Sequence, residues 1–230
     1  MLNLFPSKFK TNPFIMRLYF KVILFGIFSF NFLFAQENQN EKSVFQSYPE
    51  IKVYAGVPIG IGDNFISKGH DPKINYGLYV SPFSLFDIKI GLGVDFSRFK
   101  VSDVSLVGNG TSTNMGLIYG SFSYPLILTE KFEFEPKVGI GASWIQQKMG
   151  GEGFGRMEGM TILLGSSLEY NLEHPFVIFI GTDYSYSKYN VEAPADYKGF
   201  FENVSKLNVY AGIKFTMRKK KNLTTKIDNP

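Results

Sequence analysis

The chain has 230 residues, enough for one full-sized domain, and it contains 24 Phe, 13 Tyr and 23 Gly but no cysteine. The missing cysteine excludes disulfides, cysteine metal sites, a cysteine nucleophile and a lipidated N-terminal cysteine. The first 35 residues hold four of the 24 basic residues and none of the 20 acidic ones, so the formal charge of +4 belongs to this leader and the remainder is neutral. No broad positive field therefore favours nucleic acid as a partner.

The leader has the three parts of a secretory signal peptide. Arg17 and Lys21 supply the basic part, residues 22–34 form the apolar run, and Ala35 is a suitable residue before cleavage. This apolar run is shorter than the roughly 20 residues that a membrane-spanning helix requires. The sequence therefore predicts a signal peptide at residues 1–35 that directs export and is then removed.

Two polar segments flank the rest of the chain. Residues 36–49 are polar and aperiodic, which predicts a disordered N-terminus after cleavage. Residues 218–230 are basic and polar and are expected to form a tail beyond the last ordered element. Both Met1 and Met16 are possible starts, because the first 15 residues add little to the signal.

Between these two polar segments, apolar and polar residues alternate with a period of two, which is the pattern of β-strands. In the first segment Ile51 and Val53 lie on one face, whereas Lys52 and Tyr54 lie on the other. The eight segments with this alternation are residues 51–62, 74–81, 87–97, 113–124, 132–144, 159–170, 176–187 and 206–217.

The fourth segment breaks the alternation. Met115, Leu117 and Tyr119 indicate one apolar face, whereas Phe122 and Tyr124 indicate the other. A single extra residue in one strand reverses the direction of every side chain that follows it. We therefore expect a bulge or a change of register within this segment.

The second face of the segments is rich in Gly and Ser and carries single charges of both signs. Small residues suit the interior of a narrow barrel, so the apolar face is expected to meet lipid. The predicted fold is all-β: a transmembrane antiparallel up-and-down β-barrel of eight strands, preceded by the signal peptide. Eight strands leave an interior that side chains fill, which favours a salt-bridged lumen over an acid/base pair or an ion path. The charged residues assigned to this lumen network are Lys89, Asp95, Glu133, Glu135, Lys137, Glu169, Asp183 and Lys214.

Connections of alternating length separate the strands. Outer-membrane barrels have long extracellular loops and short periplasmic turns, so both termini are expected in the periplasm. The long connections are residues 62–72, 102–112, 148–157 and 190–204, and the short ones are residues 82–86, 125–131 and 171–175.

Aromatic residues gather at both ends of the apolar face. Such girdles are typical of the two membrane–water interfaces, whereas a general preference of strands for aromatic residues does not place them at strand ends. The girdle expected near the turns comprises Phe132, Phe134, Tyr170, Phe176 and Phe215, and the girdle expected near the loops comprises Phe96, Trp144, Tyr184 and Tyr186.

The last strand carries a family resemblance. Residues 210–217, Tyr-Ala-Gly-Ile-Lys-Phe-Thr-Met, resemble the C-terminal signal of outer-membrane barrels, although Tyr210 stands where a more polar residue is usual. Residues 50–217 resemble the eight-stranded outer-membrane barrel superfamily, which includes the transmembrane barrel of outer membrane protein A, here without a peptidoglycan-binding domain. The resemblance implies location in the cell outer membrane and a periplasmic tail, with the barrel-assembly machinery as a partner during biogenesis. It specifies no function, because one fold hosts many functions.

The sequence leaves three possible functions open. The first is a non-enzymatic envelope barrel with a structural role or with loops for adhesion or partner binding. Tyr197, Phe200 and Phe201 are the candidate loop contacts, unless they fold back onto the barrel rim. The second is an accessory barrel of a secretion or assembly system. The expected partners are outer-membrane lipid or lipopolysaccharide and an unknown protein at the loops.

The third function is an outer-leaflet enzyme that modifies lipid. Ser67, His70 and Asp71 in the first long loop are the least implausible catalytic group. No His-x-Ser pair occurs at a strand end, and the glycine-rich run at residues 150–155 does not match a phosphate-binding motif. We therefore expect no enzymatic activity and no catalytic residues, and we expect neither a cofactor nor a metal site.

Overall fold

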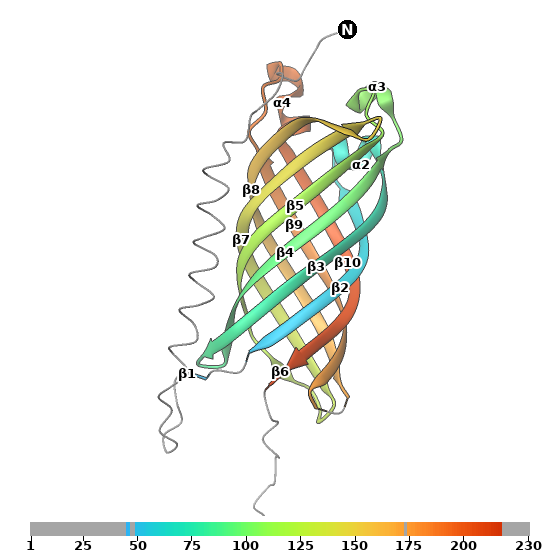
Figure 1. Cartoon of the computed structure of the whole chain (residues 1–230). Helices are drawn as coiled ribbons and strands as arrows, with labels where there is room; N and C mark the ends of the chain where they lie inside the picture. The colour runs from blue at the N-terminus through green and yellow to red at the C-terminus, as the bar shows by residue number, and fades with distance from the viewer. Residues whose placement is uncertain (1–44, 47–48, 173, 218–230) are drawn as a thin grey trace, which may run out of the picture.

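The computed structural model describes residues 45–46, 49–172 and 174–217 (Figure 1). The predicted signal peptide, most of the polar N-terminal segment and the basic tail lie outside the described residues. Within the described part of the chain, no helix is long and apolar enough to cross a membrane.

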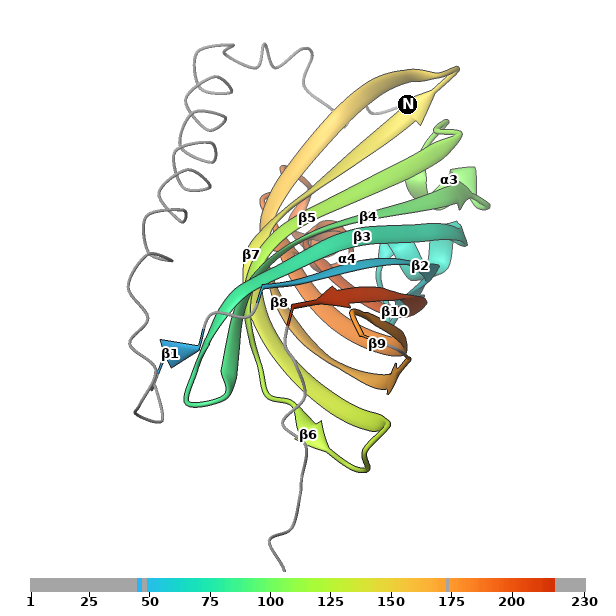
Figure 2. The same ribbon diagram turned by 60° about the horizontal axis from the view of Figure 1, so that its bottom comes forward.

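Eight long antiparallel strands form a closed barrel (Figures 1 and 2). Each long strand pairs with the next along the chain, and the last one returns to pair with the first, from Thr216 opposite Glu50 to Ser205 opposite Ile61. The eight-stranded up-and-down barrel predicted from the alternation is therefore confirmed. The strands are β2 (Glu50–Ile61), β3 (His70–Leu85), β4 (Ile88–Val101), β5 (Ser112–Ser123), β7 (Phe132–Met149), β8 (Glu152–Asn171), β9 (Phe176–Tyr189) and β10 (Asn203–Thr216).

The alternation sorts side chains into an apolar outward surface and a polar inward one. In β2, Val53 is 57% exposed and Val57 is 45% exposed, whereas Lys52 and Tyr54 are buried. Charged residues on the inward face can pair with one another, while the outward face offers mainly aliphatic and aromatic side chains. A barrel dissolved in water would have the opposite distribution, because an extended apolar surface is unfavourable there.

The fourth long strand, β5, is regular, and the expectation of a bulge or register change within it is wrong. Its register against β4 and β7 is continuous along its length. Met115, Leu117 and Tyr119 point inward and are buried, while Ile118 and Phe122 point outward. Both faces of β5 are apolar because the lumen itself is apolar at this height. Register shifts occur instead in the β3–β4 and β7–β8 pairings.

The barrel has a loop end and a turn end. The connections at the loop end contain the short helices α2 (Phe65–Gly69), α3 (Val104–Val107) and α4 (Ala195–Glu202), which lie at the top of Figure 1. The short connections lie at the turn end, together with the small strands β1 (Phe45–Gln46) and β6 (Leu126–Ile127). β1 falls within the segment predicted to be disordered, yet its backbone pairs with β3.

The long loop expected at residues 148–157 is absent from the described structure. β7 and β8 continue to a two-residue turn at Gly150 and Gly151, where the φ angles are 60° and 93°. Positive φ at both central residues matches the twist of the flanking strands in a tight hairpin, and glycine adopts it without steric cost. The glycine-rich run therefore extends a hairpin instead of forming a loop.

Candidate functional site

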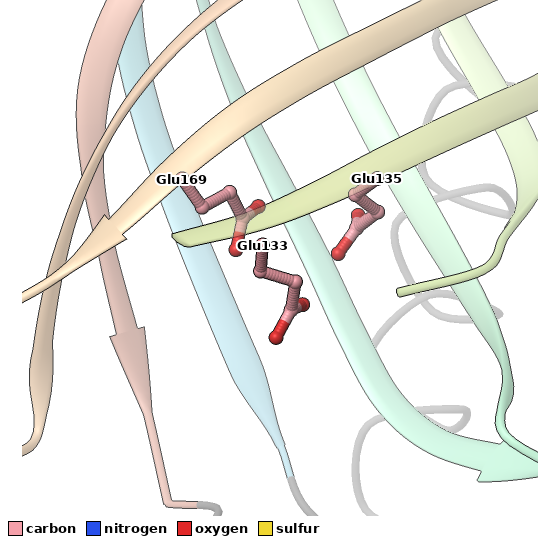
Figure 3. A group of neighbouring side chains, drawn as sticks. All are labelled: Glu133, Glu135 and Glu169. Carbon is pink, nitrogen blue, oxygen red and sulfur yellow. The ribbon is translucent and has the colours of Figure 1, made fainter. Parts of the chain in front are cut away.

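Seven charged side chains meet inside the barrel near its turn end and form what we call the turn-end charge cluster. Its members are Glu50, Lys52, Lys89, Glu133, Glu135, Glu169 and Lys214. Lys52 Nζ lies 2.6 Å from Glu135 Oε1 and 2.7 Å from Glu169 Oε1. Lys89 Nζ lies 2.5 Å from Glu135 Oε2 and 2.8 Å from Glu50 Oε2. Figure 3 shows three of the glutamates pointing into the lumen from β7 and β8.

The ion pairs of this cluster connect strands that are not hydrogen-bonded neighbours in the barrel. Glu135 of β7 lies between Lys52 of β2 and Lys89 of β4, and Lys214 of β10 pairs with Glu169 of β8. Buried charges are strongly destabilising when a partner is removed, so each member depends on the others. The cluster consequently occupies the lumen at the turn end and holds the wall together there.

The same three carboxylates are close enough to one another to suit a metal ion. Ligand oxygens of Glu133, Glu135 and Glu169 lie within 4.8 Å of one another. The ammonium groups of Lys52 and Lys89 already contact two of these carboxylates at 2.5–2.7 Å. Lysine therefore supplies the positive charge that this group of acids requires, and we assign the cluster to ion pairing.

The structure places all eight charged residues of the predicted network inside the barrel, and each takes part in an ion pair. Three further lumen charges, Glu50, Lys52 and Lys206, were missing from that set. The alternation places Lys52 and Lys206 on the polar face of their segments, and this position is the signal that identifies them as lumen residues. Glu50 gives no such signal, because it precedes the first alternating segment. Lys206 Nζ lies 3.2 Å from Asp95 Oδ1 and donates to Ser97 Oγ at 2.7 Å.

An aromatic layer fills the lumen between the turn-end charge cluster and the loop end. Its members are Tyr54, Tyr79, Leu117, Tyr119, Leu163, Phe179 and Tyr210. Lys137 Nζ lies 5.5–5.9 Å from the centres of three tyrosine rings and 2.9 Å from Asp183 Oδ2. A cavity of about 10 Å³, enough for about one water molecule, is lined by Lys137 and by rings of this layer.

Glycines in β4 make room for two rings of the aromatic layer. A Cβ atom on Gly91 would lie 2.2 Å from Tyr79 Oη, and one on Gly93 would lie 2.3 Å from Tyr119 Cζ. Both separations are far below van der Waals contact. The Gly-Leu-Gly triplet of this strand therefore has a steric cause, since two tyrosine rings lie directly against the backbone.

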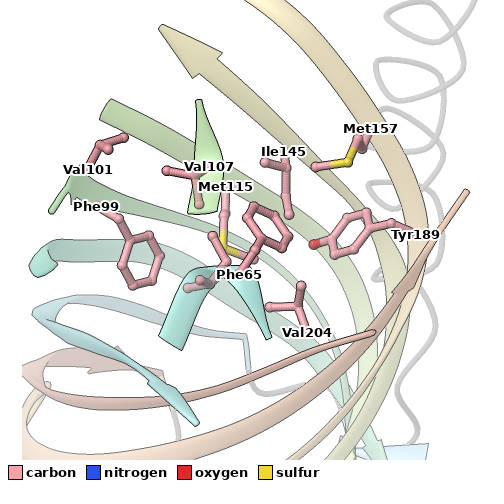
Figure 4. Close-up of a cluster of buried hydrophobic side chains, with 10 residues drawn as sticks. Phe65, Phe99, Val101, Val107, Met115, Ile145, Met157, Tyr189 and Val204 are labelled. Carbon is pink, nitrogen blue, oxygen red and sulfur yellow. The ribbon is translucent and has the colours of Figure 1, made fainter. Parts of the chain in front are cut away.

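A hydrophobic plug closes the lumen at the loop end (Figure 4). Its members are Phe65, Ile66, Phe99, Val101, Val107, Met115, Ile145, Met157, Tyr189 and Val204. Phe65 and Ile66 begin α2 and are fully buried. Asn64 caps this helix by accepting hydrogen bonds from the backbone N–H groups of Ile66 and Ser67. The sequence pattern gives no sign of the plug, because Phe65 and Ile66 are two apolar residues in an aperiodic segment.

His70 fastens α2 to the barrel wall. Its Nδ1 donates to the carbonyl oxygen of Phe65 at 3.0 Å, since a carbonyl can only accept, and its Nε2 then accepts from Thr113 Oγ1 at 2.7 Å. The residue begins β3, six positions before Tyr76, whose ring stacks on Phe96 of the loop-end girdle, so His70 lies on the loop side of that girdle. Burial lowers the pKa of His70, although the Phe65 carbonyl and the nearby Asp71 carboxylate oppose this shift.

The three candidate catalytic residues are not brought together as a catalytic group. Ser67 Oγ donates within its own turn, to the carbonyl oxygens of Gly62 and Asn64. The two ring nitrogens of His70 are bonded elsewhere, and Asp71 is exposed. A hydroxyl, an imidazole and a carboxylate that share no hydrogen bond lack the geometry of an activated nucleophile.

Two of the three candidate loop contacts face the plug. Phe201 packs on Phe65 with ring centres 5.5 Å apart, and Phe200 packs on Phe201 at 5.1 Å. Both are partly buried against the plug, which is the folded-back alternative left open by the sequence. Tyr197 is 62% exposed and is the aromatic residue that α4 presents to solvent.

Aromatic residues ring the outward surface at both ends. At the loop end, Phe96 and Trp144 pack with ring centres 6.1 Å apart. The hydroxyls of Tyr184 and Tyr186 hydrogen-bond to side chains of β10 at 3.0 and 2.7 Å. The ring pairs at the turn end are Phe132 with Tyr170 at 5.0 Å and Phe176 with Phe215 at 5.9 Å. Phe134, paired in register with Leu168, lies beside them on β7.

Comparisons with known proteins bear on the fold. No protein-family model and no curated protein matches the sequence. Among solved structures, Neisserial surface protein A matches with a TM-score of 0.53 and 14% identity, covering 75% of this chain and 97% of that one. Ail, the attachment invasion locus protein of Yersinia pestis, has a TM-score of 0.43 and 14% identity, covering 74% and 99%. The outer membrane protein OprG of Pseudomonas aeruginosa has a TM-score of 0.40 and 12% identity, covering 78% and 100%. At such low identity these likenesses concern the fold alone.

Proposed function

We propose that this chain, whose fold is that of the eight-stranded outer-membrane β-barrels, is a non-enzymatic integral outer-membrane protein. In this proposal the lumen is closed and the loop end is a fixed platform for binding a partner. One observation carries the proposal: the barrel is apolar outside, between two aromatic girdles, and is filled inside by ion pairs and rings.

The outward surface supports residence in a membrane. Leu92, Ile140 and Ile180 are 67, 59 and 61% exposed, and they are typical of the band between the girdles. A continuous apolar band of this kind is unfavourable in water and favourable against hydrocarbon. The short connections at the turn end then belong on the periplasmic side with the chain termini, and the loop end faces outward.

The interior supports a barrel that does not conduct. Three fillings follow one another along the lumen: the turn-end charge cluster, the aromatic layer and the hydrophobic plug. An eight-stranded barrel has an interior that side chains suffice to fill. A solute would have to displace ion pairs and packed rings in succession.

The plug supports a binding role at the loop end instead of a purely mechanical one. It fixes α2, and through Phe200 and Phe201 it also fixes α4. A preorganised surface loses little conformational entropy when a partner binds. The side chains presented there include Tyr197 and Val104, which are 62 and 57% exposed.

Cell fractionation of a Gram-negative host that expresses the full chain tests the proposal. We expect the protein in the outer-membrane fraction, with a mobility shift between boiled and unboiled gel samples. We also expect no unit conductance from the purified barrel in a planar lipid bilayer. Recovery as a soluble periplasmic protein would contradict membrane residence, and steady channel openings would contradict the closed lumen.

A further inference from the structure

A row of four polar residues crosses the outward surface just beyond the loop-end girdle, and we call it the basic row. The register pairs Arg98 of β4 with Asn114 of β5, Asn114 with Gln146 of β7, and Gln146 with Arg156 of β8. The two arginines are exposed and the two amides between them are half-buried. The row therefore offers a guanidinium group at each end and two amides in the middle.

Two lysines add positive charge on the side of the basic row that faces the loop end. Lys100 and Lys148 are the next outward residues of β4 and β7. Three acids lie nearby: Glu158 accepts from Arg156 Nε at 3.0 Å, Asp71 lies opposite Lys100 in the register, and the exposed Glu152 lies opposite Met149, next to Lys148. The four cations still outnumber these three acids, and Arg156 has further guanidinium donors beyond the one that Glu158 uses.

An aromatic surface lies on the other side of the basic row, toward the middle of the barrel. Trp144 lies across β5 at Gly116, where a Cβ atom would be 2.1 Å from Trp144 Cζ2. Phe96 packs against this indole, and the Arg156 guanidinium lies 5.8 Å from its centre. The basic row is thus joined directly to the rings that mark a membrane interface.

The other side of the barrel has different chemistry near its loop end. The outward residues of β2 there are Val57, Ile59 and Ile61, which are all exposed and apolar. On β9, Lys188 forms an ion pair with Glu202 at 3.0 Å. Positive charge on the described outward surface is therefore concentrated on the side formed by β4, β5, β7 and β8.

We propose that the basic row binds the headgroup of a glycolipid that carries a phosphate at each end of a disaccharide. Three strand spacings separate Arg98 from Arg156, which places their backbones about 14 Å apart, a span suited to two phosphates joined through two sugar rings. Arginine binds phosphate oxygens in a bidentate manner. Asn114 and Gln146 offer amide donors and acceptors to the sugar hydroxyls between them, and the acyl chains pack along Trp144.

The inference rests on the proposed function, because such a lipid must occupy the leaflet at the loop end. The test uses the full mature barrel in nanodiscs of neutral phosphatidylcholine. One set contains a small fraction of bisphosphorylated lipid A, and a matched set contains the same lipid after enzymatic removal of its phosphates. Native mass spectrometry after release from the nanodisc measures the fraction of barrels that retain the glycolipid.

We expect about tenfold greater retention of the phosphorylated lipid, and loss of this preference in the double variant R98Q/R156Q, because both charge-assisted contacts are removed. The control K188Q/K198Q removes the same charge from β9 and α4 and should keep the preference.

Equal retention of the two lipids, or an unchanged preference in R98Q/R156Q, would overturn the proposal. Displacement of the lipid by equimolar inorganic phosphate would also overturn it, since the surface would then bind phosphate without recognising a lipid headgroup. A barrel that fails to insert into either nanodisc, with no mobility shift on unboiled gels, would contradict the proposed function itself.

Discussion

Lys52 of β2 and Glu135 of β7 meet across the lumen, with 2.6 Å between Nζ and Oε1. Their strands lie on opposite sides of the barrel in the order of pairing, so the contact spans the interior. Both side chains are buried, at 7 and 2% exposure. A buried charge needs its partner, which makes the filled lumen a condition of barrel stability and not an incidental packing detail.

The substitution E135Q tests this dependence. It removes the carboxylate that lies between Lys52 and Lys89 and leaves both ammonium groups with fewer partners. We expect a loss of about 3–5 kcal/mol in the free energy of unfolding, measured by urea titration in lipid vesicles. The control is E158Q, which breaks the exposed pair with Arg156 and should cost under about 1 kcal/mol. Similar losses in the two variants would contradict the role of the cluster.

The steric role of glycine beneath the aromatic layer is tested by G93A. The new methyl group would overlap the Tyr119 ring, so we expect a loss of about 1–3 kcal/mol, typical of overpacking. The matched control is G120A on β5, because the nearest heavy atom to a Cβ there is Leu92 Cδ2 at 3.9 Å. The double variant G93A/Y119L should recover part of the loss. If G93A and G120A unfold at the same urea concentration, the rings do not restrict this position.

The plug is tested by F65A, which empties a fully buried position in α2. Removal of a buried phenyl group costs about 3–5 kcal/mol of stability. Because Phe65 belongs to the plug, we expect this loss to destabilise the closed state of the loop end. We expect faster hydrogen exchange in residues 65–69 and unchanged exchange in β8 and β9. V104A, at an exposed position of α3, serves as the control and should change neither. Unaltered exchange of α2 in F65A would show that the helix is held by other contacts.

Acid should loosen the same end of the barrel through His70. Its pKa is lowered from the ordinary 6.5 while it is buried in the closed plug, so the opened state binds the proton more readily. The closed plug is therefore fully stable above about pH 6.5 and loses stability as the pH falls from that value through the lowered pKa. Hydrogen exchange of α2 between pH 7.5 and 5, corrected for intrinsic rates, measures this loss, and H70N should flatten the dependence. A wild-type profile that is flat over this range would rule out the His70 contribution.

The exterior and the inward or outward direction of successive strand residues were predictable because they follow from a local rule. Alternation with period two assigns Val53 outward and Lys52 inward whatever the rest of the chain does. The same rule failed for β5, where Leu117 and Ile118 are both apolar. One meets the lumen and the other meets the outside, and a single sequence does not distinguish an apolar lumen from an apolar exterior.

The sequence predicts which types of residue fill the lumen, but it does not predict which of these residues contact one another. Charge on the inward face required ion pairs, but the meeting of Lys52 with Glu135 depends on the radius and shear of the closed barrel, which no local pattern encodes. The plug depends on the first long loop turning inward at Phe65, and the hairpin at Gly150 depends on two positive φ angles. The plug and the hairpin both depend on tertiary structure, and both lie in segments whose sequences show no periodicity.

Trp144 is the only tryptophan in the chain, so its fluorescence reports one position of the loop-end girdle without any substitution. The most direct test of the central claim is quenching of this fluorescence by brominated lipids in vesicles that contain the refolded barrel. We expect a blue-shifted emission that is quenched more strongly by bromine placed near the headgroup than by bromine near the bilayer centre. Absence of quenching at every depth would contradict an outward surface that meets lipid.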